Sequence, residues 1–134
     1  MHVVAPTSIV VVNASSPSLG LVADRLERDG YRVIPCAELA RAHAVIQATM
    51  PDLVVLDGRG AAATSWRVPA MLKLDAKTST IPVLLCLADD PDHAALTARA
   101  AAMGCSILLE PFEPDDLLAR IRDLLGSRSG TVPA

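Results

Sequence analysis

Two kinds of hydrophobic repeat alternate along the chain. The first is a short run of apolar residues rich in branched side chains, bounded by polar or turn-forming positions. These runs cover residues 8–12, 31–34, 52–56, 82–87 and 106–109. Continuous apolar runs of this length are typical of strands that are buried on both faces of a sheet. We therefore expect five strands.

The stretches between the runs repeat apolar residues at helical spacing. In residues 18–30 the repeat falls at Leu19, Val22 and Leu26, which lie on one face of a helix. The same spacing predicts further helices over residues 38–50, 69–76, 90–104 and 113–126. Glycines at positions 30, 104 and 126 are expected to end three of these helices, because glycine readily adopts the left-handed backbone of a helix terminus. Acidic residues open the last two helices, where the helix dipole favours them.

The alternation of strand and helix predicts the architecture and the extent of the domain. Repeated strand–helix–strand units form a parallel sheet with helices on both faces, so the fold class is α/β, doubly wound in three layers. A chain of 134 residues fits one domain. Residues 8–126 carry the pattern and should form that domain. Residues 1–7 are expected to be a flexible start, and residues 127–134 a disordered tail or a linker stub.

Composition and charge exclude several classes of function. Hydrophobic residues make up 51% of the chain and aromatic residues 2%, which predicts a folded protein with an aliphatic core. The net charge is −3 without a basic block, so this domain is not expected to bind nucleic acid. No apolar run approaches the roughly 18 residues of a membrane span, and the start does not resemble a secretory signal. We expect a cytoplasmic protein with no membrane contact.

Three cysteines are spread along the chain. Cys36, Cys86 and Cys105 are odd in number and far apart, which fits neither a disulfide framework nor a zinc site. We interpret them as buried free thiols.

The carboxyl ends of the predicted strands carry the candidate functional residues. Parallel strands end at one edge of the sheet, and ligands bind at that edge in open α/β folds. The residues at or just beyond these ends are Asn13, Ala14, Asp57, Leu87 and Glu110. We predict that they converge, with the Asp57 carboxylate directed at a pocket.

Four segments give the chain a clear resemblance to a known family. They read "RDGYRV", "PDLVVLDGR", "TIPVLL" and "EPFEPDDLLARIRDLL". In this order and spacing the chain resembles the receiver domains of two-component response regulators, the CheY-like proteins, over residues 8–126. The resemblance implies a five-stranded parallel sheet in the order 2-1-3-4-5. It also implies a module that accepts a phosphoryl group on an aspartate from a histidine kinase and sits ahead of an output domain.

The same resemblance shows which residues of the phosphorylation pocket differ. Asp57 stands at the phosphoacceptor position. Asn13 and Ala14 stand where the family has an acidic pair that holds Mg²⁺. Leu87 replaces the threonine or serine that meets the phosphoryl group, and Glu110 replaces a lysine. Ile107 stands roughly at the position of the switch aromatic, so the resemblance describes a degenerate, pseudo-receiver pocket.

These differences oppose phosphoryl transfer. Mg²⁺ needs oxygen ligands and is usually held by one or two carboxylates, whereas Asn13 offers a neutral carbonyl and Ala14 offers nothing. Transfer also depends on neutralising the charge of the phosphoryl oxygens. A unit charge 4 Å away is worth about 4 kcal/mol at an effective dielectric of 20, and Glu110 would turn that attraction into repulsion. We expect no cofactor, and at most weak Mg²⁺ binding.

Three hypotheses follow, none of them enzymatic. The first is a phosphorylation-independent receiver that binds a protein partner or a second copy through the face formed by residues 90–104, 106–109 and 113–126. The second is a residual phosphoreceiver that uses Asp57, with Asp89 or Asp90 reaching over for metal. The third is a small anion-binding domain that uses the hydroxyl-rich loop at residues 13–18.

Simpler roles remain open for individual residues. Asp57 is alternatively a turn or helix-capping residue, and Glu110 alternatively pairs with Arg59. Trp66 is expected to be half-buried packing on the third helix. His43 and His93 are expected on the surface.

Overall fold

The computed structural model describes residues 7–12, 17–57, 66–87, 93–109 and 112–129. In chain order the elements are β1 (Ser8–Val12), α1 (Pro17–Arg28), β2 (Arg32–Cys36), α2 (Leu39–Thr49), β3 (Leu53–Asp57), α4 (Arg67–Leu74), β4 (Val83–Leu87), α5 (His93–Ala102), β5 (Cys105–Leu109) and α6 (Pro114–Ser129). All strand pairs are parallel, and the sheet order is β2-β1-β3-β4-β5. The predicted fold class and strand order are confirmed.

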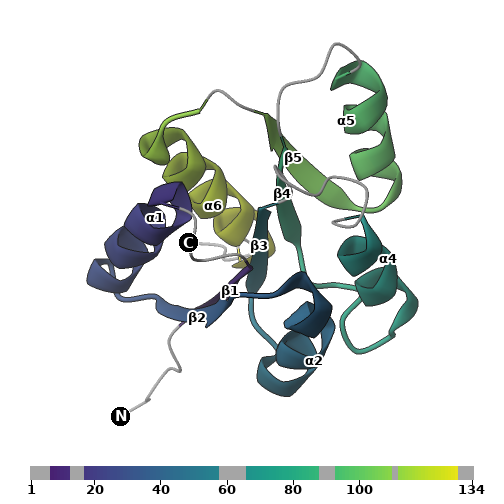
Figure 1. Cartoon of the computed structure of the whole chain (residues 1–134), viewed down its shortest axis with the longest axis horizontal. Coiled ribbons are helices and arrows are strands. Elements are labelled where there is room, and N and C mark those ends of the chain that lie inside the picture. Colours follow the sequence, from purple (N-terminus) through teal and green to yellow (C-terminus); the bar gives the residue numbers. More distant parts are fainter. Residues whose placement is uncertain (1–6, 13–16, 58–65, 88–92, 110–111, 130–134) are drawn as a thin grey trace.

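The helices cover the sheet as two layers. Figure 1 shows α1 and α6 on one side and α2, α4 and α5 on the other. Side chains alternate along each strand, so Val10 and Val12 of β1 face the α2–α4–α5 layer, while Ile9 and Val11 face the α1–α6 layer. The three central strands are almost completely buried because both of their faces are covered. This explains why their sequences are apolar runs without alternation.

Helix ends agree with the glycine prediction at two of three positions. Gly30 (φ 96°) and Gly104 (φ 70°) adopt the left-handed backbone and follow α1 and α5. Gly126 does not end its helix, because α6 continues to Ser129. A glycine inside a helix costs only about 1 kcal/mol relative to alanine, and the buried Leu125 beside it holds this turn of α6 against the sheet.

The helix over residues 38–50 ends without a glycine. Met50 adopts the left-handed conformation (φ 45°), and its N–H donates to the carbonyl of Ile46.

The two ends of the chain are described only in part. Residues 127–129, which the sequence places in a disordered tail or linker, are helical because α6 continues to Ser129, and residues 130–134 lie outside the described part of the chain. The expected flexible start also lies outside it, except for Thr7. None of the described helices is long and apolar enough to cross a membrane.

Candidate functional site

The five parallel strands end at the edge of the sheet where the sequence places the pocket. Val12 of β1 pairs with Leu56, Asp57 pairs with Cys86, and Leu87 pairs with Leu109. Asp57 and Leu87 are the last residues of the adjacent strands β3 and β4. Both residues therefore lie at the carboxyl edge of the sheet, and the convergence of their side chains stays a prediction.

Three of the predicted pocket residues lie outside the described part of the chain. These are Asn13, Ala14 and Glu110, together with Asp89, Asp90 and Arg59 of the alternative hypotheses. The strands that precede these positions are described: β1 ends at Val12, before Asn13 and Ala14, and β5 ends at Leu109, before Glu110. The placement of the three side chains stays a prediction.

Asp57 is a buried carboxyl group. It is 6% exposed, and the other polar residue buried in the described part of the chain is Thr78. The described residues contain no group of three histidine, cysteine, aspartate or glutamate side chains that would hold a metal ion. Within this part of the chain, Asp57 supplies one carboxyl group of the kind that binds Mg²⁺.

Leu87 is a core residue. Its side chain is 1% exposed and belongs to the apolar cluster beneath α4 and α5, which also includes Trp66. A leucine here contributes apolar contacts and no hydrogen bond. The strand end that the resemblance assigns to a hydroxyl group therefore carries a residue committed to packing.

Ile107 lies on the outer strand and is half-buried. Its side chain packs against the same apolar cluster as Leu87. Its carbonyl accepts a hydrogen bond of 3.1 Å from Nη1 of Arg120 on α6. This contact partly covers the free edge of β5, a device that limits pairing with foreign strands. Sequence reasoning missed it because the two residues belong to different elements.

Trp66 is more deeply buried than predicted. The residue directly precedes α4, and its side chain is 4% exposed. The Arg99 guanidinium of α5 lies over the indole ring, with Cζ 4.6 Å from the ring centroid. Such cation–π contacts stabilise by about 0.5–1 kcal/mol at exposed sites. The contact links α4 to α5, and sequence periodicity alone does not reveal it.

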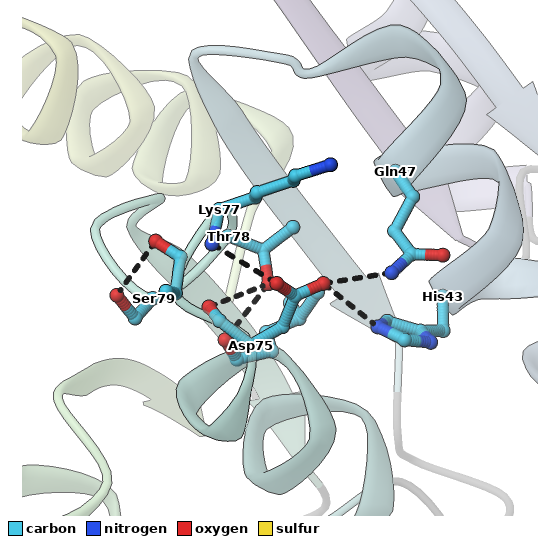
Figure 2. Close-up of polar contacts among 8 residues, drawn as sticks. His43, Gln47, Asp75, Lys77, Thr78 and Ser79 are labelled. Atoms are coloured by element: carbon cyan, nitrogen blue, oxygen red, sulfur yellow. Dashed lines mark hydrogen bonds and ion pairs between the residues drawn. The ribbon is translucent and has the colours of Figure 1, made fainter.

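A polar cluster joins α2 to the end of α4 (Figure 2). Nε2 of Gln47 donates to Oδ2 of Asp75 at 2.7 Å, and the N–H of Lys77 donates to Oδ1 at 3.0 Å. Nε2 of His43 lies 3.8 Å from the same Oδ2. The Gln47 hydrogen bond, followed by the Lys77 N–H and the nearby His43, lowers the pKa of Asp75. His43 is thus half-buried at a helix contact, whereas the sequence predicted it on the surface.

The three cysteines are buried and free, as predicted. Burial raises the pKa of the Cys105 thiol, an effect opposed by a backbone hydrogen bond and by the Lys73 ammonium. A protonated, buried thiol is a poor nucleophile. This agrees with a packing role.

A hollow opens on the face formed by α5, β5 and α6. It has a volume of about 460 Å³ and is lined by Thr97, Ala100 and Ala101 of α5, by β5 from Cys105 to Leu109, and by Arg120 of α6. β5 is an edge strand, so this face has no further strand beside it. It is the face that the sequence interpretation assigned to protein contacts.

Comparison with known proteins gives the fold a family context. The chain matches a high-resolution structure of the chemotaxis response regulator CheY4 of Vibrio cholerae with a TM-score of 0.76 and 20% identity, over 90% of this chain and 99% of that one. This is the fold of response-regulator receiver domains. The N-terminal domain of a response regulator receiver protein from Methanoculleus marisnigri shares it, with a TM-score of 0.65 and 28% identity over 89% of this chain and 96% of that one.

Sequence comparison supports the same relationship. The chain is 27% identical over 118 residues to the phosphate regulon transcriptional regulatory protein PhoB of Pseudomonas aeruginosa, a match that covers 88% of this chain and 51% of that protein. The receiver-like chain thus spans about half the length of the curated relatives it matches. No protein-family model matches it.

Proposed function

We propose that the chain is the receiver module of a two-component signalling system and that it works without phosphorylation, through protein contacts. The receiver fold and the sequence similarity to transcriptional regulators support the first part. The burial of Leu87 carries the second part, because the position that meets the phosphoryl group in the family holds a packed aliphatic side chain. Asn13, Ala14 and Glu110 support it further from the sequence. The module would act in the cytoplasm and would not itself be an enzyme.

The contact surface in this proposal is the α5–β5–α6 face. Its hollow offers small and apolar side chains of α5 and β5, with Arg120 at the side. A second copy of the chain, an output domain or a histidine kinase would bind there. A regulator of this kind is switched by the concentration of its partner, because its pocket is not phosphorylated.

The experiment compares wild type with a rebuilt pocket. Both proteins are incubated with acetyl phosphate and Mg²⁺, and the covalent phosphoryl group is followed by intact-mass spectrometry. The rebuilt protein carries Asn13→Asp, Ala14→Asp, Leu87→Thr and Glu110→Lys together, since the parts of such a site act as a unit and their effects are not additive. We expect the rebuilt protein to gain the group and wild type to stay unmodified.

Two controls make the comparison decisive. Adding Asp57→Asn to the rebuilt protein should remove the modification, and circular dichroism should show that all variants are folded. Modification of wild type at Asp57, at a rate close to that of the rebuilt protein, would refute phosphorylation independence.

A residual phosphoreceiver is the second candidate function. The observation in its favour is Asp57 itself, a carboxyl group retained in a buried position at the end of β3. Modification of wild type that disappears in Asp57→Asn would establish this candidate.

A further inference from the structure

An apolar hollow lies between α2 and α4. Figure 1 shows these two helices away from β5 and α6. The hollow has a volume of about 220 Å³ and is lined by Leu39, Ala40 and His43 of α2 and by Arg67, Val68 and Met71 of α4. The two helices lie side by side on one layer of the sheet. The hollow runs along the seam between them.

Exposed apolar side chains concentrate around this seam. Met71 is 43% exposed and Leu74, one turn further along α4, is 87% exposed. Met50 is 46% exposed and follows α2, three residues after the Gln47 side chain that reaches Asp75. Of the large hydrophobic residues exposed in the described part of the chain, only Leu21 lies elsewhere. Clustered apolar exposure marks interaction surfaces, and methionine adapts its shape to a partner.

The hollow is already formed in the free chain. Gln47 and His43 of α2 both point to Asp75, which directly follows α4, and hold the carboxyl-terminal ends of the two helices together (Figure 2). Thr78 adds a buried hydrogen bond of 2.8 Å to the carbonyl of Leu72. A preformed groove reduces the ordering cost of binding.

The charges along the seam are polarised. α2 and α4 both run from the pocket edge of the sheet toward the opposite edge, so their positive dipole ends lie together at Leu39 and Arg67. Arg67 adds an exposed guanidinium to this end of the lining. Glu38 precedes α2 and lies outside the lining, and Asp75 at the far end is engaged by Gln47 and Lys77. The end of the hollow near Arg67 therefore favours a carboxylate.

We propose that this seam is a docking site for an amphipathic helix of a partner protein. The helix would lie antiparallel to α2 and α4 with its apolar stripe on Leu39, Val68 and Met71. Its acidic carboxyl-terminal turn would contact Arg67. In this orientation the negative dipole end of the partner helix meets the positive ends of α2 and α4. The site is independent of the α5–β5–α6 face and of the state of Asp57.

The test uses a synthetic, fluorescently labelled helical peptide of about four turns. It carries leucines at positions i, i+3, i+4 and i+7 and two glutamates in its last turn. Fluorescence anisotropy measures its affinity, and NMR amide shifts map its contacts. We expect shifts confined to α2, α4 and the segment between Leu74 and Ser79.

Variants assign the apolar and the charged contributions separately. Met71→Glu and Arg67→Glu should each weaken binding by about tenfold or more, because the first removes an apolar contact and the second replaces the cation that faces the glutamates. A second peptide with lysines in place of the glutamates should bind Arg67→Glu better than it binds wild type. Leu21→Glu on α1 is the matched control, since Leu21 is 61% exposed on the opposite layer, and it should leave affinity unchanged.

The proposal fails under three results. The first is no measurable binding of the acidic peptide, or shifts that map to α1 or to the α5–β5–α6 face. The second is equal affinity for the acidic and lysine peptides, which would remove the charge argument. The third is a loss in Leu21→Glu as large as that in Met71→Glu. Circular dichroism confirms the fold of each variant before its affinity is compared.

Discussion

Leu87 connects packing and function at the scale of one residue. Its side chain fills the apolar layer beneath α4 and α5, at the strand end where receivers have a hydroxyl group. Restoring the hydroxyl with Leu87→Thr would remove apolar volume and bury a polar group. We expect the free energy of unfolding to fall by about 1–3 kcal/mol, measured by urea denaturation followed by circular dichroism.

A matched substitution separates the loss of packing at Leu87 from the general effect of exchanging leucine for threonine. Leu74→Thr makes the same change at a side chain that is 87% exposed, and the free energy of unfolding should stay within about 0.5 kcal/mol of wild type. Equal stability of Leu87→Thr and wild type would show that Leu87 is not needed for packing.

At the scale of elements, Asp75 holds α2 against α4. Its pKa lies below its ordinary value of 3.8, chiefly because Gln47 donates a hydrogen bond to the charged form. A carboxyl group with a lowered folded-state pKa stabilises the fold above its unfolded pKa. This stabilisation is lost as the pH falls through the folded-state value. The contact between the two helices is therefore sensitive to acid.

The lowered pKa of Asp75 makes the free energy of unfolding depend on pH. Asp75→Asn should lower the free energy of unfolding at neutral pH, and the gap from wild type should narrow as the pH falls below 3.8. Urea denaturation at a series of pH values measures the gap. A gap for Asp75→Asn that does not change with pH would contradict the role assigned to its charge.

At the scale of the whole molecule, the α5–β5–α6 face is the proposed site of association. Ala101 of α5 is exposed and lines the hollow on this face. Ala101→Glu should weaken self-association by about tenfold or more in sedimentation velocity, because a charge is then buried against apolar surface. Ala44→Glu, at an exposed position of α2, is the control and should associate like wild type. A monomeric wild type at high concentration would exclude the self-association form of the proposal.

Charge reversal at Arg122 is a less specific test of this face than substitution of Ala101. Its guanidinium pairs with Asp29, which follows α1, so a charge reversal would disturb the α1–α6 contact as well. Arg120 has a related complication because it donates to the Ile107 carbonyl. Small exposed side chains such as Ala101 report on the surface more directly.

The sequence predicted the elements that periodicity specifies. Five apolar runs became five strands, and the glycines at 30 and 104 ended their helices. Gly126 and Met50 differ because helix ends depend on tertiary packing as well as on the local residue. Leu125 holds α6 beyond Gly126, and Met50 takes a left-handed backbone without being glycine.

The candidate site was less accessible to sequence reasoning. Asp57 and Leu87 fall at strand ends and could be placed from the runs that precede them. The contacts of Trp66 with Arg99 and of His43 with Asp75 join separate elements. Local periodicity carries no information about such pairs, since they are set by how the helices pack on the sheet.

The Trp66–Arg99 contact provides an intrinsic fluorescence probe. The chain has a single tryptophan, and its ring lies buried at the junction of α4 and α5 beneath a guanidinium. Indole fluorescence responds to water and to nearby charge, so its emission maximum and intensity report on the junction between α4 and α5. A movement of α5 that lifts Arg99 from the ring becomes visible in an ordinary fluorimeter, without any dye attached to the protein.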